Sequence, residues 1–175
     1  MLGSLATVPA RMRLDLLAPS VAAAVSTVPD AEVAEIDPEL ADTSALCAAY
    51  DLPLSVSANC VIVTGRRADV ERHAACVVLA STRVDVNGLV RRRLEARRAS
   101  FASADFAVAA SEMEYGGITP IGLPAGWLLL VDAAVVATPT VVLGSGLRRS
   151  KIVLPGSALA RLPGAQVVDG LGRPA

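Results

Sequence analysis

The spacing of apolar side chains predicts a chain of short helices and strands that begins with a helix in the first thirty residues. Its apolar positions recur at steps of three and four residues, which is typical of a helix with one buried stripe: Leu14, Leu17, Val21 and Val25. Pro19 lies within this stripe, where proline either kinks a helix or marks its start. Residues 33–36 then alternate like a short edge strand. A second helix, capped by Asp42 or Thr43, is expected to run to Tyr50.

The middle of the chain is predicted to contain a strand pair and two further helices. Apolar runs over residues 58–64 and 74–80 enclose a charged segment, and this pattern favours a hairpin with a long polar loop over residues 65–73. Asp85 can then cap a helix that ends near Leu94. Another helix is expected over residues 104–112, after the cap-like Ser103.

Beyond residue 115 the pattern changes to loops, tight turns and short strands. Strands are expected over residues 128–131, 141–143 and 151–154, followed by a helix near 157–162 and a strand near Val167. There is no internal repeat and no linker long enough to separate domains. We therefore expect one domain over residues 1–175, with a helix–strand–helix part at 1–56 and a core at 57–170.

Composition refines this picture, because 53% of the residues are hydrophobic but only 3% are aromatic. The core must therefore be built from small and β-branched side chains, which favours a mixed α/β architecture. The net charge of −1 argues against a protein whose whole surface binds nucleic-acid phosphates, although a small basic patch is compatible with it. Fifteen of the sixteen basic residues are arginine, and Lys151 is the only lysine.

Cysteine, histidine and hydropathy patterns exclude other classes of protein. The three cysteines have no metal-binding spacing and lie in apolar surroundings, so we expect reduced core thiols: Cys47, Cys60 and Cys76. The single His73 lacks a cluster of ligands, so no metal and no other cofactor is expected. The first thirty residues do not resemble a secretory signal. Asp132 and Pro139 interrupt the apolar stretch 126–144, so we expect a soluble, cytoplasmic protein that does not enter membranes.

Two glycine-containing turns are the strongest candidates for chemistry. Residues 116–122 read Gly-Gly-Ile-Thr-Pro-Ile-Gly, and such a loop is either an ordinary turn or a set of backbone amides aimed at a bound oxygen. It has neither the Walker pattern nor the dinucleotide-binding pattern. The second turn, Gly-Ser-Gly at 144–146, is either a plain strand connection or a second pocket wall, and Arg148 and Lys151 follow it.

These two turns, together with Leu-Val-Asp-Ala at residues 130–133 between them, resemble the C-terminal half of the YbaK/EbsC family. This family includes free-standing aminoacyl-tRNA deacylases and the editing insertion of prolyl-tRNA synthetases. The resemblance extends over residues 59–169 and includes the strand pair, the helix that begins at Asp85 and the closing leucine-rich helix. It implies a YbaK-like fold in which helices surround a central, mixed and partly barrel-like β-sheet.

The resemblance also implies an activity, which is hydrolysis of the ester that joins a wrong amino acid to the 3′ end of tRNA. In that family a lysine near the start of the first long strand and the amides of the glycine loop hold the substrate while water, or the substrate itself, attacks. A pocket lined by Val, Ile and Ala is expected to admit a small amino acid such as Ala, Cys or Ser. Partners would be the aminoacylated 3′ end of tRNA and an aminoacyl-tRNA synthetase.

The chain departs from the family at the lysine, because Ala58 occupies that position in our register. We hypothesise that Lys151 or Arg148 supplies the displaced charge. The expected catalytic groups are then Gly116, Gly117 and Lys151. The expected substrate-binding residues are Ala58, Asn59, Ile118, Thr119, Pro120, Gly122, Asp132, Gly144, Ser145 and Gly146.

A cluster of arginines between residues 91 and 98 offers a candidate surface for tRNA. Arg91, Arg92 and Arg93, with Arg148, would contact phosphates, and such binding weakens steeply with added salt. The alternative is a solvated helix face.

Three functions remain open from the sequence. The first is a deacylase of mischarged tRNA. The second is an inactive homologue that binds aminoacyl-tRNA or an aminoacyl-adenosine-like ligand without hydrolysis, which the loss of the family lysine would explain. The third is a partner-binding module with an exposed apolar patch.

Overall fold

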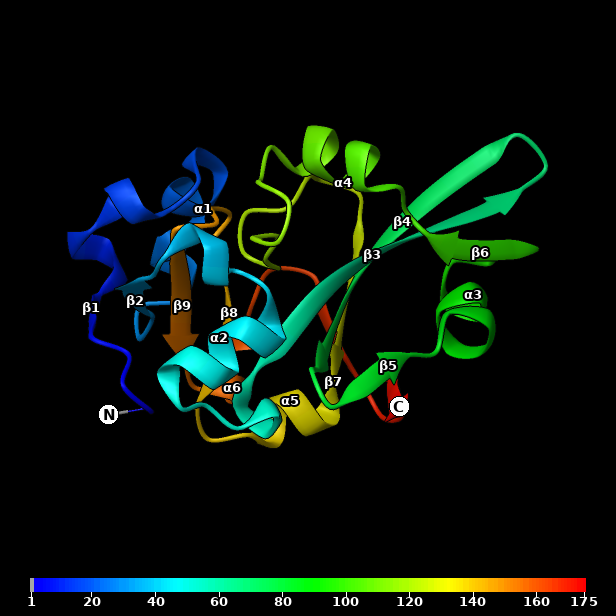
Figure 1. Ribbon diagram of the computed structural model, residues 1–175. Coiled ribbons are helices and arrows are strands. Elements are labelled where there is room, and N and C mark those ends of the chain that lie inside the picture. The colour runs from blue at the N-terminus through cyan, green and yellow to red at the C-terminus, as the bar shows by residue number, and fades with distance from the viewer. Residues whose placement is uncertain (1) are drawn as a thin grey trace.

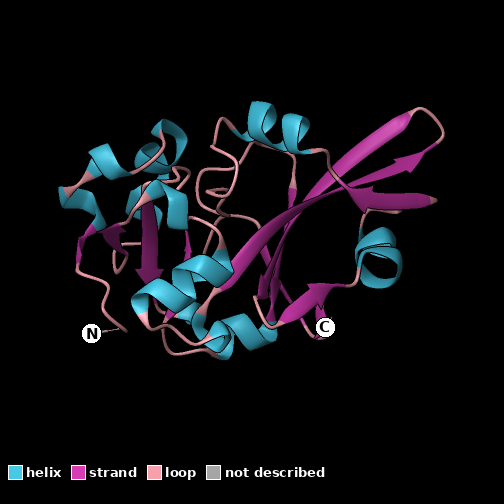
Figure 2. Cartoon of the chain, in the orientation of Figure 1, coloured by secondary structure: helices cyan, strands magenta, loops and turns pink. Residues whose placement is uncertain are grey.

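A computed structural model describes residues 2–175, which form two main open sheets and a small strand pair (Figures 1 and 2). The first sheet is antiparallel in the order β1-β2-β9-β8, with β1 (Thr7–Pro9), β2 (Glu32–Glu35), β9 (Ser150–Leu154) and β8 (Val141–Gly144). The second is mixed in the order β10-β7-β4-β3-β6, with β10 (Ala165–Val168), β7 (Leu128–Asp132), β4 (Val70–Leu79), β3 (Ala58–Arg67) and β6 (Arg98–Phe101). Strands β5 (Thr82–Val84) and β11 (Gly172–Pro174) form the small pair.

The helices are short and lie around the two main sheets (Figure 1). They are α1 (Pro19–Ala24), α2 (Thr43–Tyr50), α3 (Arg91–Arg93), α4 (Ala104–Ser111), α5 (Ala133–Ala137) and α6 (Gly156–Leu159). A π-helical turn at Val86–Val90 leads directly into α3. Asp42 caps α2 by accepting the amide hydrogens of Ser44 and Ala45. Pro19 marks the first turn of α1, which confirms one of the two expected roles for this proline.

The mixed α/β class expected from composition is confirmed, whereas partly barrel-like closure is not. Both main sheets are open, and an isolated bridge between Ser57 and Val142 links them without closing either one. The first fifty-six residues are not a separate layer, because β1 and β2 pair in one sheet with β9 and β8 from the far end of the chain. The bridge at Ser57 therefore brings the start of β3 against the strand that carries the second glycine turn.

The long polar loop expected at residues 65–73 was a wrong prediction. Strands β3 and β4 are ten residues each, and their pairing continues through the charged segment to Arg67 and Val70. A tight turn at Ala68 and Asp69 joins them, with Ala68 in the left-handed region at a φ of 53°. The charges are compatible with strand structure because the tip of the hairpin projects from the molecule and is exposed (Figure 1).

Candidate functional site

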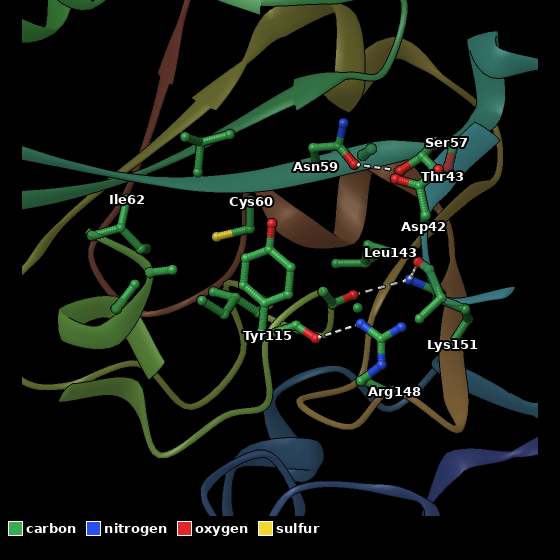
Figure 3. Close-up of a pocket in the computed structure, with 18 of the residues that line it drawn as sticks. Asp42, Thr43, Ser57, Asn59, Cys60, Ile62, Tyr115, Leu143, Arg148 and Lys151 are labelled. Atoms are coloured by element: carbon green, nitrogen blue, oxygen red, sulfur yellow. Dashed lines mark hydrogen bonds between the residues drawn. The ribbon is translucent and has the colours of Figure 1, made fainter. Parts of the chain in front are cut away.

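A pocket of about 510 Å³ opens between the start of β3 and the end of β8 (Figure 3). Its walls come from β3, the segment before α2, the chain around α4, the glycine loop, and strands β8 and β9. Strand β6 pairs with β3 only from Val63 to Arg66, so no strand of the described chain covers Asn59 to Val61 on that side. The open edge of β3 therefore forms one side of the pocket.

Lys151 is the buried cation of this pocket. Its side chain leaves β9, and the residue is only 6% exposed. The ammonium Nζ donates to the backbone oxygen of Ala41 at 3.0 Å and to that of Gly116 at 3.4 Å (Figure 3). A lysine carries three N–H donors, so one remains for a ligand.

Burial, together with the smaller effect of the nearby Arg148 guanidinium and against the opposing effect of Asp42, lowers the pKa of Lys151 to about 8. The group is therefore still charged at neutral pH, but less strongly than an exposed lysine. A shift of this kind in a pocket is typical of a functional group. The structure thus brings the only lysine of the chain into the same pocket as Ala58, which occupies the position of the family lysine.

Arg148 also lines the pocket, and two of the five N–H donors of its guanidinium bind main-chain oxygens. Its guanidinium donates to Tyr115 O at 3.1 Å and to Pro38 O at 3.0 Å, and its backbone amide donates to the Glu114 carboxylate. These contacts fasten the glycine loop to the segment before α2. Of the two cations proposed from the sequence, Lys151 is therefore the more deeply buried, and Arg148 is the one that joins separate segments of the backbone.

The glycine loop presents only part of its backbone to the pocket. Gly116 and Ile118 line the cavity, and among residues 2–175 the structure contains no hydrogen bond from either amide. The Gly117 amide instead donates to Glu114 O, and the Thr119 amide points at the Met113 sulfur. Among the amides of residues 116–119, those of Gly116 and Ile118 are therefore the two without a partner in the described chain.

The second glycine turn supports the first through close main-chain contact. Gly146 N donates to Gly117 O at 2.7 Å, and Glu114 N donates to Gly146 O at 2.8 Å. A Cβ added to Gly144 would lie 2.4 Å from Gly117 O and 2.6 Å from Ile118 O. Only glycine permits this approach, because real Cβ atoms do not come so close to backbone oxygens.

Several of the expected substrate-binding residues lie outside the pocket. Three residues of the glycine loop are buried and do not line the pocket: Gly117, Thr119 and Pro120. Gly122, at the end of the loop, approaches the backbone of Ser20 in α1. The Ser145 hydroxyl is buried in contacts with Leu147 and Ser150. Asp132 caps α5 through the Ala134 amide and also accepts the Gly172 amide. The residues that the structure does bring together are Ala58, Asn59, Gly116, Ile118, Gly144, Arg148 and Lys151.

Sequence reasoning missed several residues that line the pocket. Asp42 and Thr43 do so from the start of α2, and the Thr43 hydroxyl donates to the Asn59 side-chain oxygen at 3.0 Å. Two exposed aromatic side chains, Tyr115 and Phe101, stand at its rim. Only 3% of the residues are aromatic, and this scarcity was the signal that could have drawn attention to these two.

The arginine cluster lies away from the pocket and is divided. Arg91 faces a hollow that it shares with Arg97 and Arg98, whereas Arg92 and Arg93 line another, and Arg93 donates to Gln166. Among the described residues there is no cluster of three or more potential metal ligands. The described part of the chain also contains no helix of sufficient length and hydropathy to span a bilayer.

Comparison with known protein families decides what kind of domain carries this pocket. A family model described as an aminoacyl-tRNA editing domain matches residues 37–162, well over half of the chain. The chain belongs to the aminoacyl-tRNA editing domain family. A search among curated proteins found no match. The matched range of this editing domain includes every wall of the pocket described above.

Solved structures with the same fold support this assignment. The editing domain is similar to a protein described as a candidate trans-editing enzyme for prolyl tRNA synthetase, at 19% identity and a TM-score of 0.72, over 87% of this chain and 94% of that one. It is also similar to the hypothetical protein APE2540, at 18% identity and a TM-score of 0.71, over 81% and 90% of the two chains. At this level of identity the likeness shows the fold, which is the YbaK-like fold expected from the sequence.

Proposed function

We propose that this editing domain hydrolyses the ester of a mischarged tRNA, with Lys151 in place of the family lysine. The observation that carries the proposal is the buried ammonium of Lys151 beside two amides without partners, those of Gly116 and Ile118, in one pocket. Donors fixed in a partly dry site stabilise a developing oxyanion strongly, because they need no reorganisation when the charge appears.

In the proposed reaction a water oxygen attacks the ester carbonyl carbon, and the carbonyl oxygen becomes an oxyanion. The third N–H of Lys151 and an amide of the glycine loop donate to that oxygen. Collapse of the intermediate re-forms the C=O bond and breaks the bond to the ribose oxygen. That oxygen leaves as the 3′-terminal hydroxyl after it takes up the proton lost by water, and the free amino acid departs.

Water is the proposed nucleophile because the thiol in the pocket is poorly suited to this role. Cys60 lines the cavity, but burial raises the pKa of its thiol well above the usual range, so the reactive thiolate is scarce. Ser57 is buried at the pocket wall, and His73, the single histidine, lies outside the pocket against Phe106 and Trp127. His73 is therefore not placed to activate the Ser57 hydroxyl.

The lining of the pocket favours a small amino acid. The residues that line the cavity include five alanines, Ala41, Ala58, Ala102, Ala104 and Ala107, and the larger Ile62 and Leu143. We propose Ala, Cys or Ser as the amino acid that is removed. Such a site discriminates by the size of the side chain, and one methylene changes the ratio of kcat/KM between two substrates only about 10- to 200-fold. We further propose that the domain acts in the cytoplasm, beside a synthetase.

The second candidate function is binding without hydrolysis, and the Ala58 position favours it. A domain that lacks the family lysine can retain the pocket and hold aminoacyl-tRNA while the ester survives. Hydrolysis separates the two candidates directly.

The test is a deacylation panel with Ala-, Cys- and Ser-charged tRNA at low salt. The wild type is expected to release at least one amino acid. Lys151→Met should lose about 10²- to 10³-fold in rate, by analogy with the removal of one oxyanion donor. Arg161→Gln is the control, because Arg161 is exposed beside Asp30 and outside the pocket. Binding of all three tRNAs without release would favour the second candidate function.

A further inference from the structure

A surface groove continues from the pocket over the open edge of β3. A second hollow of about 540 Å³ shares Asn59, Val61 and Phe101 with the pocket. A third, of about 700 Å³, shares Asn87 with the second. The groove changes direction at β3, because Asn59 and Cys60 extend to opposite sides of that strand (Figure 3). The second hollow therefore adjoins both the pocket and the third hollow.

The groove beyond the pocket is lined by arginine. Arg83 lies in the second hollow, and Arg91, Arg97 and Arg98 lie in the third. All four are exposed, and none of them forms an ion pair with any of residues 2–175. Two further arginines there are paired, Arg66 with Glu71 and Arg173 with Asp85. In a chain with a net charge of −1, four unpaired guanidinium groups along one path are a strong local concentration of positive charge.

Phe101 stands where the pocket and the groove meet. It is the last residue of β6, its side chain is 59% exposed, and it lines both the pocket and the second hollow. Because the phenyl ring is largely exposed, it contributes little to the packing of the fold. At the mouth of a site for a nucleotide ester, such a ring is a platform on which a base can stack.

We infer that this groove, the arginine groove, binds the single-stranded 3′ segment and adjoining phosphates of the RNA that carries the ester. The inference rests on the proposed function for the position of the ester. Phe101 stacks a base next to the terminal nucleotide, and Arg83, Arg91, Arg97 and Arg98 contact successive phosphates. The arginines bind without reading sequence, since phosphate contacts position a nucleic acid and base contacts specify it.

The experiment compares two charge-matched double variants of the full chain. Arg97→Gln/Arg98→Gln removes two charges from the arginine groove, and Arg11→Gln/Arg161→Gln removes two exposed charges elsewhere. The first is expected to bind uncharged tRNA roughly tenfold more weakly at low salt, with a salt slope smaller by roughly 1.4. The second should bind like the wild type. Equal weakening by both double variants, or by neither, would overturn the inference.

A second comparison tests Phe101. Phe101→Leu is expected to weaken binding of a short oligonucleotide ending in the tRNA 3′ sequence about tenfold, while Phe101→Trp should preserve it because stacking needs only an aromatic face. Loss of binding by both variants, or by neither, would contradict the stacking role.

The experiments distinguish a wrong inference about the arginine groove from a wrong proposed function. A 3′-aminoacyl-adenosine reaches only the pocket, so Arg97→Gln/Arg98→Gln should hydrolyse it at the wild-type rate while it loses activity on aminoacyl-tRNA. If the domain is no hydrolase, neither ester is cleaved by any variant, yet the binding measurements still report on the groove.

Discussion

At the scale of single residues, the proposed chemistry depends on Lys151. A lysine that is 6% exposed, with its ammonium on two main-chain oxygens, is unfavourable for folding and useful only where a positive charge is needed. The sequence alone could single it out as the only lysine beside a glycine turn. It could not show the partners Ala41 and Gly116, because both are more than thirty residues away along the chain.

The charge of Lys151 predicts a pH profile. Because burial lowers its pKa to about 8, the ammonium is largely protonated at pH 7 and is lost as the pH rises past 8. We expect the ratio of catalysed to spontaneous ester hydrolysis to fall about tenfold per pH unit above that point. Stopped deacylation assays from pH 6 to 10 measure it. In Lys151→Arg, whose guanidinium stays charged, any remaining activity should not show the fall, and a fall of equal size in both proteins would contradict the assignment.

At the scale of elements, the site depends on the contact between the two glycine turns. The helices and strands with clear periodicity could be predicted, including α2, α4, β7 and β9, because their patterns are local. The short strands β1, β5 and β11 were not predicted, since each has three residues and exists only through a distant partner. The contact of Gly144 with Gly117 and Ile118 could not be predicted either, although both turns were identified from the sequence.

Replacement of Gly144 by alanine tests this contact. The new methyl would meet two backbone oxygens within 2.6 Å, so we expect the glycine loop to shift, stability to fall by about 2–4 kcal/mol and deacylation to be largely lost. Chemical denaturation and single-turnover assays measure the two effects. Gly126→Ala is the matched control, because its methyl meets nothing within 4 Å and costs only about 1 kcal/mol for its positive φ. Equal effects at both positions would show that the contact is unimportant.

At the scale of the whole molecule, the buried charge ties stability to pH. The pKa of Lys151 is about 8 in the fold and 10.5 when unperturbed, so between these values the unfolded chain holds a proton that the folded chain has released. Stability therefore rises with pH across that window, by up to about 3 kcal/mol from this group. We expect the free energy of unfolding of wild type minus that of Lys151→Met to increase from pH 8 to pH 10.5. Parallel curves for the two proteins in urea would contradict the buried charge.

The two main open sheets meet at Ser57 and Val142, with the pocket beside that junction and the arginine groove adjoining the pocket. Composition was enough to predict the mixed α/β class. The junction itself joins Ser57 to Val142, 85 residues further along the chain, and no local pattern encodes such a pairing.

The most direct measurement is single-turnover deacylation of a mischarged tRNA at pH 7 by wild type, Lys151→Met and the double variant Ala58→Lys/Lys151→Met. If the pocket needs one ammonium, which a lysine at position 58 on β3 or at position 151 on β9 can supply, the deacylation rate of Lys151→Met falls about 10²-fold or more. The double variant then recovers part of the rate. Deacylation by Lys151→Met at the wild-type rate would contradict the account.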